Sequence, residues 1–228
     1  MLPQETQQLI AQFTKLPGIG PRQAARFVFY LLRNEHEISS LLDTLKSMKE
    51  NITLCKNCFL PASVSTLCAI CVSPKRDKNT ICLVEKETDA LNFEKTGQFQ
   101  GHYFVLGGFI DPLHKESIAY ERLNFLVRKL TTHSNKALPF DHDRTQKVIE
   151  NSGNSKNDSE TNNRELILAL TPRREGDFTS HYIEEQLKPL KNQGVPIKIT
   201  RLGRGLSSGA ELEYADGETL KNALAGRR

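Results

Sequence analysis

Two Cys-x-x-Cys pairs constrain this chain more than any other feature. Cys55 and Cys58 form the first pair, and Cys68 and Cys71 form the second after nine intervening residues. This spacing is typical of two tight turns that present four thiolates to one tetrahedral zinc ion. Two disulfides or four free thiols are the alternatives, but nothing in the sequence marks an oxidising compartment in which disulfides persist. We therefore predict one structural zinc per chain, without the open ligand position that activates water.

Composition limits the class of protein. The chain has 228 residues, of which 38% are hydrophobic and none is Trp, which is enough for one large domain or two to three small ones. No apolar run reaches the length of a membrane span, and the first residues lack the basic-then-apolar order of a signal peptide. We therefore expect a soluble cytoplasmic protein. Its net charge of +4 permits nucleic-acid binding without requiring it.

The hydrophobic pattern predicts a helical N-terminal part followed by an α/β domain. Apolar residues at helical spacing indicate three helices within residues 1–50, and Pro21 is suited to open the second of them. From Thr80 onward, short apolar runs alternate with amphipathic segments, as in a parallel sheet covered by helices. The expected strands are residues 81–84, 103–106, 165–170 and 195–200, and the expected helices are 87–95, 123–130, 178–190 and 216–225.

Residues 131–163 interrupt this alternation. The segment is polar, and residues 151–163 contain no aliphatic or aromatic side chain. Such a segment buries too little apolar surface to offset the entropy of ordering, so we expect a mobile loop. A tolerated surface insertion is favoured over a functional lid.

Gly18 and Gly20 flank Ile19 in a break between the first two expected helices. Glycines can adopt positive φ and allow another backbone to approach, and free N–H groups beside a helix N-terminus bind phosphate oxygens. This is the layout of a helix-hairpin-helix, which contacts the DNA backbone without reading its sequence. The alternative is an ordinary helix turn with solvated arginines. The basic residues that could extend a DNA contact are Lys15, Arg22, Arg26 and Arg33.

Acidic residues follow two of the expected strands. Glu85 comes directly after the first strand and Asp89 one helical turn later, whereas Glu175 and Asp177 follow the third strand. Sites in open α/β sheets form outside the carboxyl ends of the strands, so the four carboxylates would converge if these two strands were neighbours. Such a cluster suits Mg²⁺. The alternative is that the acids are solvated caps at helix starts, where negative charge is favourable.

Glu85 together with Glu175 and Asp177 resembles the acidic signature of a Toprim domain, the fold shared by topoisomerases, primases and some nucleases. The order of helix-hairpin-helix, four-cysteine module and Toprim domain resembles the RecR family of bacterial recombination mediators. This resemblance covers almost the whole chain outside the polar insertion. The segments that carry it are Leu16–Pro21, Cys55–Cys58, Glu94–Gly97, Tyr103–Gly108, Leu202–Leu206 and Glu211–Asp216.

The resemblance implies a non-catalytic, DNA-binding repair protein. Family members act with RecO and RecF to help place RecA on single-stranded DNA, and they assemble as dimers or ring-like tetramers that can encircle DNA. Positions matching Arg22 and Arg26 line the inner face of the ring, and the Toprim acids serve mainly in RecO contact and assembly. The implied division is a helix-hairpin-helix module at 1–53, a zinc finger at 54–78, a Toprim domain at 79–200 with an insertion at about 131–163, and an assembly tail at 201–228.

The chain departs from the family pattern beside its second acidic group. Residues 171–176 read Thr-Pro-Arg-Arg-Glu-Gly, where the family usually has Asn-Pro-Thr-Val-Glu-Gly. Arg173 and Arg174 lower the local negative potential and favour ionised carboxylates. They would either weaken metal binding or add a phosphate contact.

An enzyme is the competing class of protein. A Toprim domain can cleave or join nucleic acid through metal-held phosphates, and a topoisomerase also needs a tyrosine nucleophile. None of the five tyrosines stands in a recognisable nucleophile context. A Mg-dependent nuclease and a bare zinc-binding adaptor remain as alternatives. Metal-dependent change of DNA topology would mark the first, and DNA affinity that falls steeply with salt would argue against the second.

Overall fold

A computed structural model gives the structure of the protein. It describes residues 2–63, 66–132, 164–192, 195–203, 205–206, 209, 211–215 and 217–226, which form two compact units, Met1–Thr53 and Leu54–Arg228. The polar segment that the sequence predicts to be a mobile loop lies, from residue 133 to residue 163, outside the described residues. No helix in the described part of the chain is both long and apolar enough to cross a membrane.

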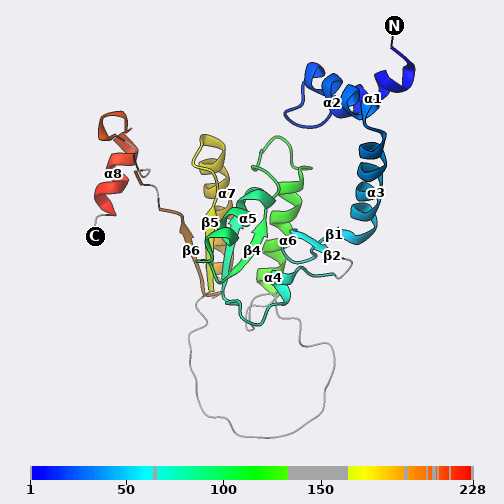
Figure 1. Ribbon diagram of the computed structural model, residues 1–228. Helices are drawn as coiled ribbons and strands as arrows, with labels where there is room; N and C mark the ends of the chain where they lie inside the picture. The colour runs from blue at the N-terminus through cyan, green and yellow to red at the C-terminus, as the bar shows by residue number, and fades with distance from the viewer. Residues whose placement is uncertain are drawn as a thin grey trace, which may run out of the picture. The chain divides into compact units, whose positions relative to one another are not determined.

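The first unit consists of three helices (Figure 1): α1 (Gln4–Thr14), α2 (Pro21–Arg33) and α3 (Glu35–Asn51). α2 begins at Pro21 as predicted, because proline lacks an N–H group that the first helical turn does not need. Phe13 of α1 packs edge-to-face on Phe27 of α2, with ring centroids 6.1 Å apart. Among residues 2–53, only Ala24 and Val28 are buried. The first unit therefore encloses a very small core and leaves many apolar side chains exposed.

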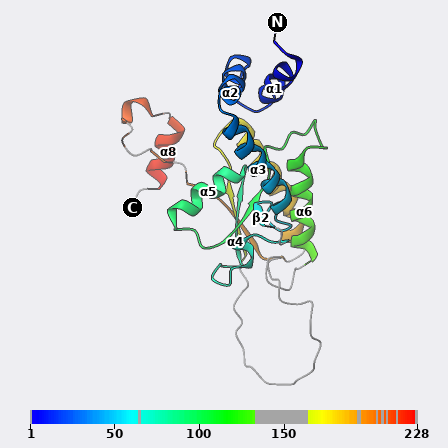
Figure 2. The same ribbon diagram turned by 45° about the vertical axis from the view of Figure 1, so that its right-hand side comes forward.

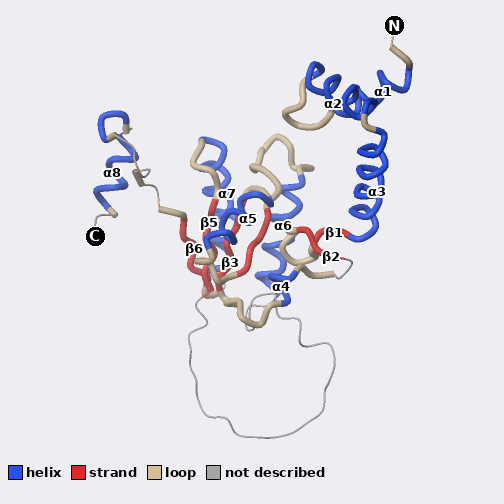
Figure 3. Tube along the Cα trace, viewed as in Figure 1, coloured by secondary structure: helices blue, strands red, loops and turns tan. Residues whose placement is uncertain are grey.

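A parallel four-stranded sheet lies at the centre of the second unit (Figure 3). β3 is a central strand, and all but its first residue are buried, as expected for a strand covered on both faces. Val84 at its end is in register with Val105 of β4 on one side and with Ala169 of β5 on the other. In the order β4-β3-β5-β6, the strands are β4 (His102–Val105), β3 (Thr80–Val84), β5 (Arg164–Ala169) and β6 (Ile197–Arg201).

Helices cover both faces of this sheet (Figures 1 and 2). The chain passes from β3 through α5 to the edge strand β4, and then crosses back through α6 to β5 and through α7 to β6. α5 lies on one face of the sheet, and α6 and α7 lie on the other. α6 and α7 are in contact, since the Tyr182 hydroxyl donates to the Tyr120 hydroxyl at 3.1 Å. The elements are α5 (Glu87–Thr96), α6 (Ile118–Thr132), α7 (Arg174–Asn192), the 3₁₀ turn η1 (Leu212–Tyr214) and α8 (Gly217–Ala225).

Two helices begin earlier than the sequence predicted. α6 begins at Ile118 instead of residue 123, and α7 begins at Arg174 instead of residue 178. The first turn of α7 is almost entirely polar, so hydrophobic spacing could not reveal it. Acidic side chains nevertheless stabilise a helix N-terminus. Glu175 and Asp177 consequently lie on the first turn of α7 and not in the preceding loop.

The cysteine module packs into the same core as the sheet. The N–H of Val105, in the edge strand β4, donates to the carbonyl oxygen of Cys58 at 3.0 Å. The ring of Phe59 lies edge-to-face against Phe104 and Phe125, at centroid distances of 5.5 and 5.4 Å. These contacts attach the module to β4 and α6. The module itself contains β1 (Ile52–Leu54), β2 (Pro61–Ser63) and α4 (Ala69–Val72).

Candidate functional site

The four predicted cysteines come together as one buried cluster. The ligand atoms of Cys55, Cys58, Cys68 and Cys71 all lie within 4.8 Å of one another, and all four side chains are buried. The Sγ atoms of Cys58 and Cys68 are 3.4 Å apart, and none of the four is in a disulfide. Tetrahedral zinc with Zn–S bonds of about 2.3 Å would place its sulfur ligands about 3.8 Å apart. The cluster therefore has the dimensions and the donor set of a closed zinc site.

Backbone hydrogen bonds hold each half of the cluster in a tight turn. The Cys55 N–H donates to Leu60 at 2.8 Å, and the Phe59 N–H donates back to Cys55 at 3.0 Å. In the second half, the Val72 N–H donates to Cys68 at 3.2 Å. Phe59 has a φ of 65° and is the one residue other than glycine with positive φ among the described residues. This conformation is uncommon for a bulky residue, and here it accompanies the packing of Phe59 between the module and the sheet.

The thiols interact strongly with one another. Hydrogen bonds from the other three thiols hold the pKa of Cys55 below its ordinary value, whereas the same neighbours raise the pKa of Cys71. Because a metal binds thiolates, metal binding at such a cluster is coupled to the release of thiol protons.

Lys129 of α6 lies close to the cysteine cluster. Its Nζ donates to the side-chain oxygen of Asn57, which stands between the first two cysteines, at 2.5 Å. The same atom lies 4.5 Å from the ring centroid of Phe125. Burial lowers the pKa of Lys129, and the neighbouring cysteines act in the opposite direction. A lysine here would partly compensate the negative charge of four thiolates around a divalent ion.

The predicted DNA-binding residues lie on an exposed turn and an exposed helix face in the first unit. Gly18 has a φ of 81°, and no other atom lies within 4 Å of a Cβ built on Gly18 or on Gly20. Gly20 is the N-cap of α2, so the free N–H groups of the first helical turn follow it directly. The turn is therefore open to a phosphate. The predicted basic residues are all exposed, namely Lys15, Arg22, Arg26 and Arg33.

The predicted acids lie at the carboxyl ends of β3 and β5, which are neighbours. Glu85 is only 5% exposed. One of its carboxylate oxygens accepts a hydrogen bond from the Thr171 hydroxyl at 3.1 Å, and the other lies 3.0 Å from Lys86 Nζ. Asp89 accepts the Lys86 N–H at 3.0 Å and so caps α5. Sequence reasoning did not identify the link between Glu85 and Thr171, which are separated by 86 positions.

These acids do not gather into a compact ligand cluster. Within the described residues, the four cysteines form the only group of three or more His, Cys, Asp or Glu side chains whose ligand atoms are close enough to share one ion. Glu175 is exposed and Asp177 half-buried, both on α7. The convergence of four carboxylates on one magnesium ion, which the sequence led us to consider, is thus not seen. Glu85 instead bonds to Thr171, and Asp89 bonds to the N-terminus of its own helix.

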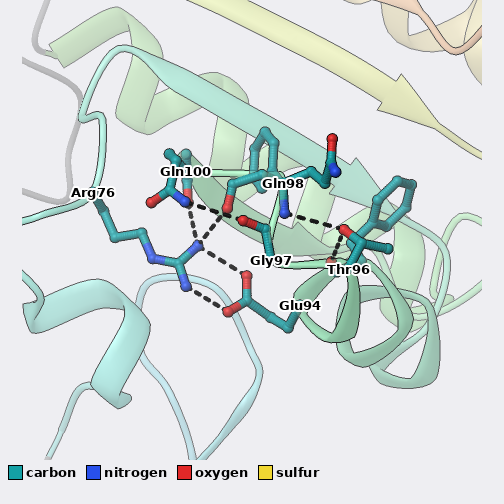
Figure 4. Close-up of polar contacts among 9 residues, drawn as sticks. Arg76, Glu94, Thr96, Gly97, Gln98 and Gln100 are labelled. Carbon is teal, nitrogen blue, oxygen red and sulfur yellow. Dashed lines mark hydrogen bonds and ion pairs between the residues drawn. The ribbon is translucent and has the colours of Figure 1, made fainter.

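A second polar network lies beside the cysteine module and was not predicted from the sequence (Figure 4). The guanidinium of Arg76 forms a two-pronged ion pair with Glu94 of α5, one N–H donating to Oε1 at 2.9 Å. The same guanidinium donates to the carbonyl oxygens of Phe99 and Gly101, at 3.0 and 3.3 Å. Hydrogen bonding to Arg76 lowers the pKa of Glu94. Arg76 therefore ties the segment after the cysteines to the turn between α5 and β4.

A cavity of about 440 Å³ lies at the carboxyl ends of β5 and β6, where ligands bind in many open α/β sheets. It is lined by polar groups that include Asp177 and Ser180 of α7 and Arg201 of β6. The Arg201 guanidinium is held by Glu184 at 2.9 Å. No periodic signal in the sequence points to this cavity, because its wall combines β5, α7, β6 and residues of α8.

Three family models match the chain along its length. They are the RecR helix-hairpin-helix at residues 6–49, a Toprim domain at residues 79–201 and the RecR C-terminal region at residues 205–228. Recombination protein RecR of Dehalococcoides mccartyi is 39% identical over 222 residues, which cover 97% of this chain and 92% of that relative. The chain belongs to the RecR family.

Other RecR proteins match to a similar extent. The recombination protein RecR of Gloeothece citriformis is 37% identical over 97% of this chain and 94% of its own length. That of Herpetosiphon aurantiacus is 36% identical over 99% of this chain and 95% of its own length. The RecR helix-hairpin-helix match contains the open glycine turn, and the Toprim match contains the sheet with its carboxyl-end acids.

Proposed function

We propose that this RecR protein is a DNA-binding recombination mediator of the RecFOR type. In this role it holds gapped or single-stranded DNA, and with RecO, and with RecF as a further candidate partner, it helps to load RecA. The observation that carries the proposal is the exposed turn at Gly18 and Gly20, which continues into the arginine-bearing helix α2. Its family supports the same role, because its relatives are recombination proteins.

The glycine turn would contact the DNA backbone. Backbone N–H groups at the start of α2 would bind a phosphate oxygen, and Arg22 and Arg26 would bind neighbouring phosphates one helical turn apart. Lys15 and Arg33 would extend the same surface. Because these groups meet phosphates and not base edges, binding would be independent of sequence and would weaken with salt.

The cysteine cluster would hold one structural zinc ion. Its role would be to fold the module and to attach it to the sheet, because a site with four protein thiolates has no open position for a substrate. Cys55, Cys58, Cys68 and Cys71 would all bind the ion as thiolates.

Self-association would cover the apolar surface of the first unit. A unit with only two buried side chains among its described residues has too small a core to be stable by itself. A second copy of the chain would bury this surface in a dimer or a larger ring. The exposed apolar side chains that such an interface would cover are Leu2, Leu9, Leu16, Phe27, Leu32, Leu41, Leu42, Leu45, Met48 and Ile52.

We propose that the Toprim acids serve partner contact and not catalysis. Glu85 is buried and already bonded to Thr171 and Lys86, so it is poorly placed to receive a metal-held phosphate. Glu175 is exposed on the first turn of α7 at the same sheet edge, beside Arg173 and Arg174, and would be the acid that RecO contacts most directly. A Mg-dependent nuclease or topoisomerase is the alternative, and it would require these carboxylates to rearrange.

One experiment separates these two functions. The purified protein is incubated with supercoiled plasmid and Mg²⁺, and the DNA is run on gels before and after the protein is stripped. A mediator retards the DNA, which returns to its supercoiled position after stripping. DNA that stays nicked or relaxed after stripping would contradict the proposal. The Arg22→Glu/Arg26→Glu variant should fail to retard the plasmid, and the Lys198→Glu variant, changed at an exposed position of β6, serves as the charge-reversal control.

A further inference from the structure

The outward face of α2 carries aromatic rings between its arginines. With 3.6 residues per turn, Arg22, Arg26 and Arg33 fall within about 40° of arc, and Phe29 and Tyr30 flank them within about 100°. Tyr30 is 55% exposed and Phe29 38%. No acidic residue occurs anywhere in α2. The face is therefore a basic surface with two aromatic rings built into it.

Neither of these two rings is among the buried residues of the first unit. The opposite side of α2 makes the core, where Ala24 and Val28 are buried and Phe27 packs on Phe13 of α1. Neither Phe29 nor Tyr30 makes a ring–ring or cation–π contact within residues 2–53. Phe29 keeps 38% and Tyr30 55% of its surface exposed, so both rings offer open surface beside the three arginines.

We propose that Phe29 and Tyr30 stack on unpaired bases of single-stranded DNA while the three arginines hold its phosphates. The proposal rests on the proposed function, because it concerns the same DNA-binding helix. Aromatic rings beside a basic track are the usual means of binding a single strand without sequence preference, since every base offers a flat face. In a duplex, the bases are stacked on each other and present no free face to a ring on the surface.

Charge favours a nucleic acid over a second copy of the chain on this face. A two-fold interface centred on this face would bring the same surface of both copies together. It would gather the arginines of both copies, and α2 offers no carboxylate to pair with them. A polyanion instead complements all three. The other exposed apolar groups of the first unit, on α1 and α3, remain available for self-association.

The chain has no tryptophan, so a single Trp introduced in place of Tyr30 reports on stacking directly. In the Tyr30→Trp variant we expect strong quenching of the Trp fluorescence by oligo(dT) and little quenching by a duplex of equal length. In the Phe29→Ala/Tyr30→Ala variant we expect affinity for oligo(dT) to fall about 5-fold to 150-fold per stacked base. Duplex affinity should change less than about 2-fold, since its phosphate contacts remain. Leu113→Ala, a truncation of an exposed apolar side chain in the second unit, is the matched control.

The arginine variant separates failure of this inference from failure of the proposed function. If Arg22→Glu/Arg26→Glu binds single strands and duplexes as well as wild type, then α2 is not the DNA-binding element and the proposed function fails. If that variant loses both affinities but Phe29→Ala/Tyr30→Ala binds oligo(dT) normally and the fluorescence of Tyr30→Trp is not quenched, only the stacking is overturned. A changed molar mass of Phe29→Ala/Tyr30→Ala in light scattering, with unchanged DNA affinity, would assign the rings to a contact between copies and would also overturn it. Circular dichroism and a melting curve show that each variant is folded.

Discussion

Zinc bound at the cysteine cluster, as proposed, should stabilise the edge of the sheet as well as the cysteine module, so its removal should loosen both. The carbonyl oxygen of Cys58 accepts the Val105 N–H of β4, and Phe59 packs on Phe104 and Phe125. A hydrogen bond contributes about 1 kcal/mol net, and a fully buried Phe side chain about 1.5–3 kcal/mol. Since Phe59 is partly buried, we expect the local stability of β4 to fall by about 2–3 kcal/mol. That change corresponds to a loss of hydrogen-exchange protection of about 30-fold to 150-fold.

Hydrogen exchange followed by mass spectrometry measures this effect. The protein is compared before and after chelation of the metal, with metal analysis to show that the ion is gone. Peptides of β6, at the opposite edge of the sheet, are the internal reference and should change less than about 3-fold. Unchanged protection of β4 in protein shown to be metal-free would refute the coupling. Equal loss of protection in β4 and β6 would refute its local character.

Three further predictions concern other parts of the molecule. Arg76→Met should lower the free energy of unfolding by about 1–2 kcal/mol at pH 7, as measured by denaturant titration. Arg76 depresses the pKa of Glu94 below its ordinary value of 4.5. The difference in stability between wild type and variant should therefore shrink as the pH falls below 4.5 and Glu94 becomes protonated. Gly176→Ala should lower the free energy of unfolding by about 1–3 kcal/mol or more in thermal melts, because the added Cβ would lie 2.0 Å from the backbone oxygen of Thr171. Gly217→Ala is the control and should be near neutral, because its added Cβ would meet open space. Arg22→Ala should reduce the slope of log affinity against log salt by about one in fluorescence anisotropy titrations, for every DNA sequence alike; an unchanged slope would remove Arg22 from the phosphate contacts.

The sequence predicted those features that depend on local spacing. The two Cys-x-x-Cys pairs fix four thiols in two short turns, so the buried cluster could be foreseen. The apolar runs and the helix start at Pro21 were likewise local signals. The early start of α7 was missed because its first turn at Glu175 carries no apolar periodicity.

The sequence could not predict contacts between distant segments. The bond from Val105 to Cys58 depends on how the module docks on β4. The ion pair between Arg76 and Glu94 joins a segment without periodicity to a helix surface. β3 and β5 are neighbours, as convergence of the acids required, but the acids do not form one cluster. Glu85 instead accepts a hydrogen bond from the hydroxyl of Thr171, in the loop after β5, and nothing in the sequence signals that contact.

The position of the cysteine module also bears on solubility during synthesis. β4 is an edge strand whose four residues are all buried, and an uncovered edge strand of this kind can pair with the edge of another chain. The Cys58 carbonyl and the Phe59 ring cover part of that edge. At the other edge, β6 is polar and bears Lys198 and Arg201, which discourage such pairing without a cover. With zinc in the cysteine cluster, as proposed, loss of the metal would therefore expose this edge of β4 to pairing with another chain.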